Sequence, residues 1–119
     1  MPRFMVLMHE SDDAWAKLSA DEKQRMMEKY FAWAEELRRG DHFRGGDPLV
    51  RGGRLLRASD GDVVDGPFTE TKEVLTGYFM IEARDLDEAA TLARGCPALI
   101  HGESVVVREI AEMSEDGDH

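Results

Sequence analysis

The chain has 119 residues, a length that fits one domain and is too short for two separate hydrophobic cores. Its 25 acidic and 15 basic residues give a formal net charge of −10, which repels phosphate backbones and anionic lipid head groups, so we expect no nucleic-acid or membrane partner. Apolar residues make up 42% of the chain, enough for one core, but a domain this small often gains stability by association. Size therefore favours a homodimer.

Cysteine usage and the N-terminus predict a cytoplasmic location. Cys96 is the single cysteine, which excludes an internal disulfide and a multi-cysteine metal cage and favours a reducing compartment. The opening "MPRFMVLMHE" has a short apolar run without a cleavage-site pattern, and every apolar run is far below the ~20 residues that cross a bilayer. The histidines lack metal-ligand spacing such as H-E-x-x-H. We therefore expect no metal and no cofactor.

The first half of the chain predicts a strand followed by a long helix. Phe4–Met8 is a short run of bulky apolar residues that favours a buried strand. Ser19 and Glu22 have capping-box spacing at the start of a helix over Ala20–Arg39, and Gly40 follows its end. The apolar residues of this helix recur at three- and four-residue steps, which predicts a face packed on a sheet: Met26, Met27, Tyr30, Trp33, Ala34 and Leu37.

The middle of the chain predicts less regular structure. Residues 41–53 hold four glycines and no periodicity, so they form either a loop or a very irregular strand. The stretch "RLLRASDGDVVDG" indicates a β-hairpin, because Asp60-Gly61 is a favoured pair for a two-residue turn. Asp65, Gly66, Pro67 and Phe68 then predict a corner that ends the hairpin.

The second half of the chain predicts a strand, a helix and a last strand. "GYFMIEA" is typical of a strand. Asp85 and Glu88 have the spacing of a second capping box for a helix that ends at Gly95 and Pro97. "SVVVREI" predicts the last strand, and residues 111–119 form an acidic tail that we expect to be frayed.

These elements predict an α+β, ferredoxin-like fold with two helices on one face of a mainly antiparallel sheet. The other face is then uncovered, which favours face-to-face pairing with a second copy. The expected interface positions are Tyr78, Met80, Val105 and Val107.

Asp65 is the first candidate for a catalytic residue. A two-residue turn at Asp60-Gly61 pairs Leu56 with Asp65 and places Arg54 diagonally across the ladder. If that side faces inward, Asp65 is a carboxylate at the rim of an apolar patch, where a ligand contact or a general base is plausible. The alternative is structural, since turn aspartates commonly accept hydrogen bonds from backbone amides two residues on.

His9 is the second candidate for a catalytic residue. It ends the first strand beside Glu10, and strand ends often carry functional groups, although a solvated histidine fits the sequence equally well. Cys96 lies just past a helix end between Gly95 and Pro97, which is typical of a small buried thiol and not of a reactive thiolate.

Three segments together carry a family resemblance: "RFMVLMHESDDAWAKLSADEK", "DGDVVDGPFTETKEVLTGYFMIEARDLDEAATLARGCP" and "GESVVVREI". The chain resembles the YCII-related family, in particular the branch named after its DGPF motif, over residues 1–110. The resemblance implies a ferredoxin-like fold of the dimeric α+β barrel type, here with an inserted β-hairpin, and a cleft in each subunit. Many bacterial members are encoded beside extracytoplasmic-function sigma factors.

The resemblance also implies site residues. Asp65–Phe68 match the motif itself, and Lys72, Glu73 and Gly77 match the positions that usually follow it. The expected ligand-binding residues are Arg54, Asp65, Pro67, Phe68 and Lys72. A histidine and a following aspartate have been proposed as the catalytic pair of shorter members, but the helix over Ala20–Arg39 contains no histidine.

Two functions remain open from the sequence. The first is a small enzyme or ligand binder whose cleft takes a small polar organic molecule, with Asp65, Arg54 and His9 at the site. The second is a regulatory module without catalysis that binds a protein partner, for which a sigma factor is the candidate. Convergence of the three side chains on one pocket favours the first function.

Overall fold

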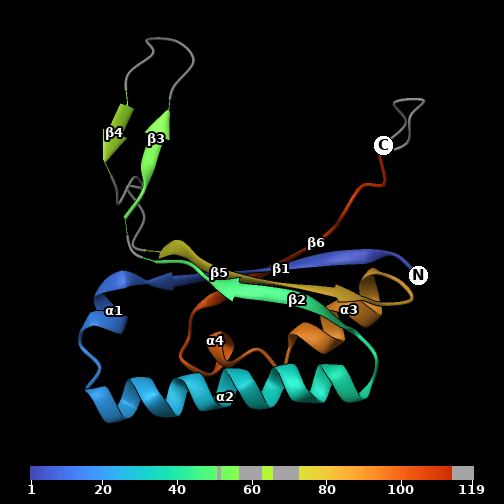
Figure 1. The fold of residues 1–119 in the computed structure, drawn as a ribbon, viewed down its shortest axis with the longest axis horizontal. Coiled ribbons are helices and arrows are strands. Elements are labelled where there is room, and N and C mark those ends of the chain that lie inside the picture. Colours follow the sequence, from blue (N-terminus) through green and yellow to red (C-terminus); the bar gives the residue numbers. More distant parts are fainter. Residues whose placement is uncertain (51, 57–62, 66–72, 114–119) are drawn as a thin grey trace.

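The computed structural model describes residues 1–50, 52–56, 63–65 and 73–113. A four-stranded sheet forms the centre, with strand order β2-β5-β1-β6 and antiparallel neighbours throughout. Its strands are β1 (Arg3–Ser11), β2 (Phe43–Pro48), β5 (Glu73–Glu82) and β6 (Ser104–Glu109). Three helices cover one face (Figure 1): α2 (Ala20–Arg39), α3 (Leu86–Ala93) and α4 (Pro97–Ile100). This arrangement confirms the α+β, ferredoxin-like prediction, and a short helix, α1 (Asp12–Ala16), follows β1.

Helix α2 has the predicted bounds because both of its ends are encoded locally. The Glu22 backbone N–H donates to Ser19 Oγ at 3.1 Å, and the Ser19 N–H donates to Glu22 Oε1 at 2.9 Å, which completes the capping box. At α3 the prediction was only half right. The Glu88 N–H donates to Asp85 Oδ1 at 2.8 Å, but Glu88 Oε1 accepts from the N–H of Arg84, one residue before the N-cap.

The core lies between the sheet and these helices. Alternation along β1 directs Phe4, Val6 and Met8 toward the helices, and each is at most 4% exposed. Trp33 of α2 stacks on Phe79 of β5, with ring centroids 4.6 Å apart and planes within 11°. The apolar face predicted for α2 is therefore confirmed as the face that packs on the sheet.

None of the described helices lies on the other face of the sheet (Figure 1). Tyr78 and Met80 lie on it as predicted, but the assignment of Val105 and Val107 was wrong. In the register of β6 these two valines lie beside Met8 and Val6 and pack against the core, whereas Val106 lies on the open face with 41% of its surface exposed. A run of three valines has no alternation of its own, so only the pairing with β1 decides which ones face the helices.

Strand β2 resolves the choice that the sequence left open at residues 41–53, in favour of an irregular strand. Its pairing with β5 shifts register between Phe43 and Gly46. Gly45 has φ of 123°, and a Cβ on Gly46 would lie 2.5 Å from the Tyr78 carbonyl oxygen. The glycines thus permit a bulge and a close approach to β5.

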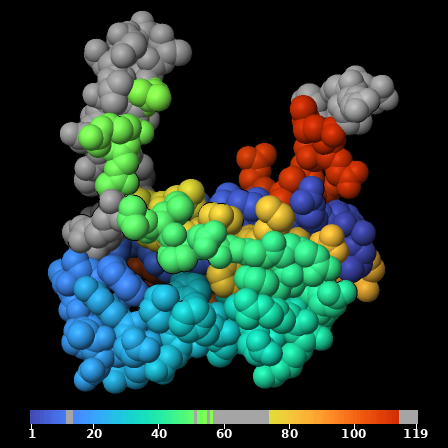
Figure 2. Space-filling view, in the orientation of Figure 1, coloured from blue at the N-terminus to red at the C-terminus, as the bar shows by residue number. Residues whose placement is uncertain are grey.

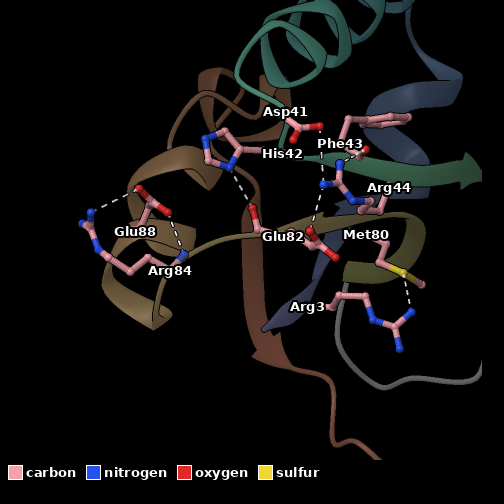
Figure 3. A network of polar contacts seen from close by, with 9 residues as sticks. All are labelled: Arg3, Asp41, His42, Phe43, Arg44, Met80, Glu82, Arg84 and Glu88. Carbon is pink, nitrogen blue, oxygen red and sulfur yellow. Dashed lines mark hydrogen bonds and ion pairs between the residues drawn. The ribbon is translucent and has the colours of Figure 1, made fainter. Parts of the chain in front are cut away.

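A polar cluster joins the connection between α2 and β2 to the end of β5 (Figure 3). An Arg44 guanidinium nitrogen lies 2.8 Å from Glu82 Oε2 and 3.5 Å from Asp41 Oδ1. His42 Nδ1 is 2.7 Å from the Glu82 carbonyl oxygen. Because these contacts span residues far apart in the chain, they hold β2 at the edge of the sheet.

Strands β3 (Arg54–Leu56) and β4 (Val63–Asp65) pair with each other in a separate two-stranded sheet, the β3–β4 ribbon, which projects from the body (Figure 1). The ladder pairs Arg54 with Asp65 and Leu56 with Val63, so the predicted register was wrong by two residues. An Asp-Gly pair sets the register only when it forms the centre of a two-residue loop, and this ladder is not centred on Asp60 and Gly61. The predicted corner at 66–68 and the tail from 114 onward lie outside the described residues.

Candidate functional site

A cavity of about 280 Å³ lies between α2 and the four-stranded sheet. A hollow in the surface is visible where α1, α2 and β2 come together (Figure 2). The lining is mostly apolar and includes a few polar residues. Its members are Met8, Glu10, Trp15, Met27, Tyr30, Phe31, Ala34, Arg38, Phe43, Gly46, Asp47, Pro48, Leu49, Thr76, Gly77 and Phe79. Apolar walls with a small number of polar groups are typical of small-molecule sites.

Glu10 is the best-anchored charged group in this lining. The Tyr30 hydroxyl donates to Glu10 Oε1 at 2.6 Å, and the Thr76 hydroxyl donates to Glu10 Oε2 at 3.0 Å. The three residues come from β1, α2 and β5. Two hydrogen bonds from different elements fix the orientation of the carboxylate on the cavity wall.

A β-bulge places Thr76 in this group. Met8 pairs with Gly77 and His9 pairs with Leu75, so Thr76 is an extra residue on β5. Its hydroxyl lies 3.4 Å from the Met8 carbonyl oxygen as well as reaching Glu10. Bulges commonly redirect a side chain next to a functional site, and this one turns a hydroxyl toward the cavity.

Tyr30 acts in this group as a hydrogen-bond donor. Burial, together with the hydrogen bond to Glu10, raises the pKa of the Tyr30 hydroxyl far above its usual value of 10.0. The hydroxyl therefore keeps its proton at every physiological pH and continues to donate to the carboxylate. A carboxylate offers about four lone-pair positions, so two donors leave acceptor capacity for a ligand in the cavity.

The lining also includes Asp47 and one cation. The Asp47 carboxylate faces the open side of the sheet, because Asp47 pairs with Tyr78 in the ladder and Asp47 Oδ2 accepts a hydrogen bond from the Tyr78 hydroxyl at 3.0 Å, which raises the pKa of Tyr78. The Arg38 guanidinium lies over the Phe43 ring, 4.6 Å from its centroid, and 3.6 Å from Glu35. The described lining thus directs one carboxylate, that of Glu10, into the cavity and holds one cation that already has two partners.

Residues 2–114 match the model of the YCII-related domain, nearly the whole chain. The chain belongs to the YCII-related family. A protein of Rhizobium meliloti (strain 1021), described as uncharacterized, is 54% identical over 41 residues, which is 33% of each chain, so the match spans about a third of that relative.

A solved structure resembles this YCII-related chain over almost its full length. It is 5-chloro-2-hydroxyhydroquinone dehydrochlorinase from Burkholderia phenoliruptrix AC1100, in complex with 2,5-dihydroxybenzoquinone. The alignment covers 98% of this chain and 99% of that one, with a TM-score of 0.53 and 17% identity. At that identity the likeness shows a shared fold.

The residues predicted for the site do not line this cavity where they are described. His9 of β1 lies opposite Leu75 of β5 and Ser104 of β6. Its buried Nδ1 has no hydrogen-bond partner among the described groups. Arg54 lies on the ribbon, where Nη1 donates to the Gly53 carbonyl oxygen at 2.9 Å. The ladder places Asp65 opposite Arg54, in a different sheet from His9. The side chain of Asp65 and residues Pro67, Phe68 and Lys72 lie outside the described part of the structure.

Neither His9 nor Arg54 therefore lines this cavity, and a different group of residues forms it. One member had a signal in the sequence. Alternation that buries Met8 also directs Glu10 toward the helices, so Glu10, and not His9, is the inward polar residue of β1. Tyr30 was assigned correctly to the inward face of α2, but as a core residue. Thr76 gave no signal, because its orientation depends on the bulge.

Among the described residues, no group of three or more His, Cys, Asp or Glu side chains is placed to hold a metal ion. Within the same part of the chain, none of the helices combines the length and hydropathy needed to cross a membrane.

Proposed function

We propose that this YCII-related protein binds a small polar organic molecule in the cavity between α2 and the sheet and catalyses its conversion. The observation that carries the proposal is the Glu10 carboxylate, which two hydroxyl groups orient on the wall of a largely apolar cavity. A carboxylate held in this way, next to apolar surface, is suited to accept a proton or a hydrogen bond from a bound molecule.

In this proposal Glu10 contacts the ligand, and Tyr30 and Thr76 position Glu10. Positioning matters because an acid–base group must lie within hydrogen-bond distance of the atom that gains or loses the proton. The hydrogen bonds from Tyr30 and Thr76 restrict the rotation of the Glu10 carboxylate. The structural neighbour supports a small-molecule role, since it is a 5-chloro-2-hydroxyhydroquinone dehydrochlorinase in complex with 2,5-dihydroxybenzoquinone.

A homodimer through the open face of the sheet belongs to the same proposal. The centre of this face is apolar, with Met5, Leu7, Tyr78, Met80 and Val106. Charged side chains follow toward one end, where Arg3 lies opposite Glu82 and Arg108 lies opposite Met5. An apolar centre with a charged rim is the usual composition of a protein interface.

Membership of the DGPF branch, the inserted hairpin and a cytoplasmic location also remain proposals, supported by Asp65–Phe68, by the β3–β4 ribbon and by the single cysteine. The predicted catalytic role of Asp65 and His9 stays a prediction. So does the predicted ligand-binding role of Arg54, Asp65, Pro67, Phe68 and Lys72.

A thermal-shift screen of a metabolite library against the parent protein and two variants tests the proposal. A ligand that binds only the folded state raises the melting temperature. The control is Glu28→Gln, on the exposed side of α2. We expect some compounds to raise the melting temperature of the parent and of this control, and to raise that of Glu10→Gln much less. Equal shifts for all three proteins would remove Glu10 from the site and contradict the proposal.

A further inference from the structure

We infer that the cavity selects ring compounds that donate a hydrogen bond and carry no negative charge, an inference that rests on the proposed function. Three properties of the lining support this ligand class: its aromatic walls, the acceptor character of its fixed carboxylate, and the contacts that its one described cation already makes.

The walls favour a flat ring. Five aromatic side chains line the cavity, from α1, α2, β2 and β5: Trp15, Tyr30, Phe31, Phe43 and Phe79. Phe79 is held between the stacked Trp33 ring and the edge-on Phe43 ring, whose centroid is 5.2 Å away, so this wall is rigid before a ligand enters. A volume of about 280 Å³ lies at the lower end for ligand pockets, which limits the ligand to a small ring system.

The fixed polar groups require a donor. Glu10 receives hydrogen bonds from Tyr30 and Thr76 and has none to donate when ionised. The Asp47 carboxylate lies with Tyr78 on the open face of the sheet, so Glu10 is the carboxylate that a ligand in the cavity meets. A ligand hydroxyl, amine or ammonium group pairs with the free lone pairs of Glu10, whereas a ligand that only accepts hydrogen bonds leaves them unsatisfied.

The charges disfavour an anion. The carboxylate that faces the cavity, Glu10, is acidic, and the whole chain carries a formal charge of −10. Among the described residues, Arg38 is the one Lys or Arg in the lining, and its guanidinium already contacts Phe43 and Glu35. An anionic ligand would lose its hydration beside like charge without a free cation in compensation.

Four single-ring probes of similar size separate these requirements by isothermal titration calorimetry. Benzyl alcohol is a neutral donor, benzylamine is a cationic donor, benzoate is an anion, and toluene has no polar group. We expect both donors to bind the parent protein about tenfold or more tightly than benzoate and toluene. In Glu10→Gln the preference of the donors over benzoate should shrink to about threefold or less, because the charge is gone. Glu28→Gln should retain the preference of the parent.

A cavity-filling variant shows where the probes bind. Ala34 lines the cavity and is 5% exposed, so Ala34→Leu extends an isobutyl group into it, and an unchanged far-UV spectrum verifies that the variant folds. We expect this variant to bind none of the probes. If benzoate binds as tightly as the donors and Ala34→Leu abolishes this binding, the ligand class is overturned. The cavity then remains a binding site. Absence of binding by every probe, or binding that Ala34→Leu does not change, would overturn both the ligand class and the proposed function.

Discussion

The two faces of the four-stranded sheet use the same strands in opposite ways. On the covered face, β1 contributes Phe4, Val6 and Met8 to a buried core, and the row continues to Glu10 in the cavity. On the open face, Met5 and Leu7 of the same strand are only half-buried. The comparison shows that one alternating strand supplies both a stabilising core and an unpartnered apolar surface. The candidate cavity lies on the covered face, as an extension of the core.

The largest effect should come from removing a side chain on the covered face. Phe4 is fully buried, so Phe4→Ala removes its apolar contacts and leaves a void, at a cost of about 3–5 kcal/mol in the free energy of unfolding. Urea denaturation measures this cost. Met5→Ala, one residue along on the open face, should cost less than half as much when both are measured on monomeric protein.

A matched pair on β6 repeats this comparison with one residue type. Val107 packs against the core and Val106 is 41% exposed on the open face, so Val107→Ala should destabilise the protein more than Val106→Ala. Equal costs for the two valines would mean that the open face is as well packed as the covered one, and the contrast between the faces would not hold.

The second prediction concerns the partner of the open face. Met80→Glu places an uncompensated carboxylate in the apolar centre of this face, so we expect dimer affinity to fall by about a hundredfold or more. Sedimentation over a range of concentrations measures the change. Ile100→Glu, at an exposed apolar position on the helix side, should leave dimer affinity unchanged. A parent protein that sediments as a monomer contradicts the proposed dimer.

The smallest effect is a pH dependence on the covered face. Burial, as the main cause, raises the pKa of the Cys96 thiol from 9.0 to about 11. Because the folded state favours the neutral thiol, its contribution to stability is complete below pH 9.0 and is lost as the pH rises toward about 11. The raised pKa of Tyr30 acts in the same direction as the pH rises above 10.0.

Unfolding by urea between pH 8 and about 11 tests this dependence. We expect the free energy of unfolding to fall more steeply with pH in the parent than in Cys96→Ala, which lacks the thiol. Identical slopes would show that Cys96 has the same pKa in the folded and unfolded states.

The sequence was sufficient where the information is local. The capping box at Ser19 and Glu22, with periodic apolar residues after it, specified α2 over Ala20–Arg39 without any contact from the rest of the chain. The strand positions of β1, β5 and β6 and the family resemblance were readable in the same way. The inward orientation of Glu10 was not predicted, but it follows from the alternation of side chains along β1, since Glu10 is two residues after the buried Met8.

Only the tertiary structure decided which residues meet. Partner strands set the face of Val105 and Val107 and the pairing of Arg54 with Asp65, because a short apolar run or a turn pair is compatible with more than one register. The hydroxyl of Thr76 reaches Glu10 only because β5 has one residue more than β1 at the bulge, and Tyr30 reaches it from a helix twenty positions away in the chain. Such contacts depend on the relative placement of three elements, which local propensity and periodicity do not specify.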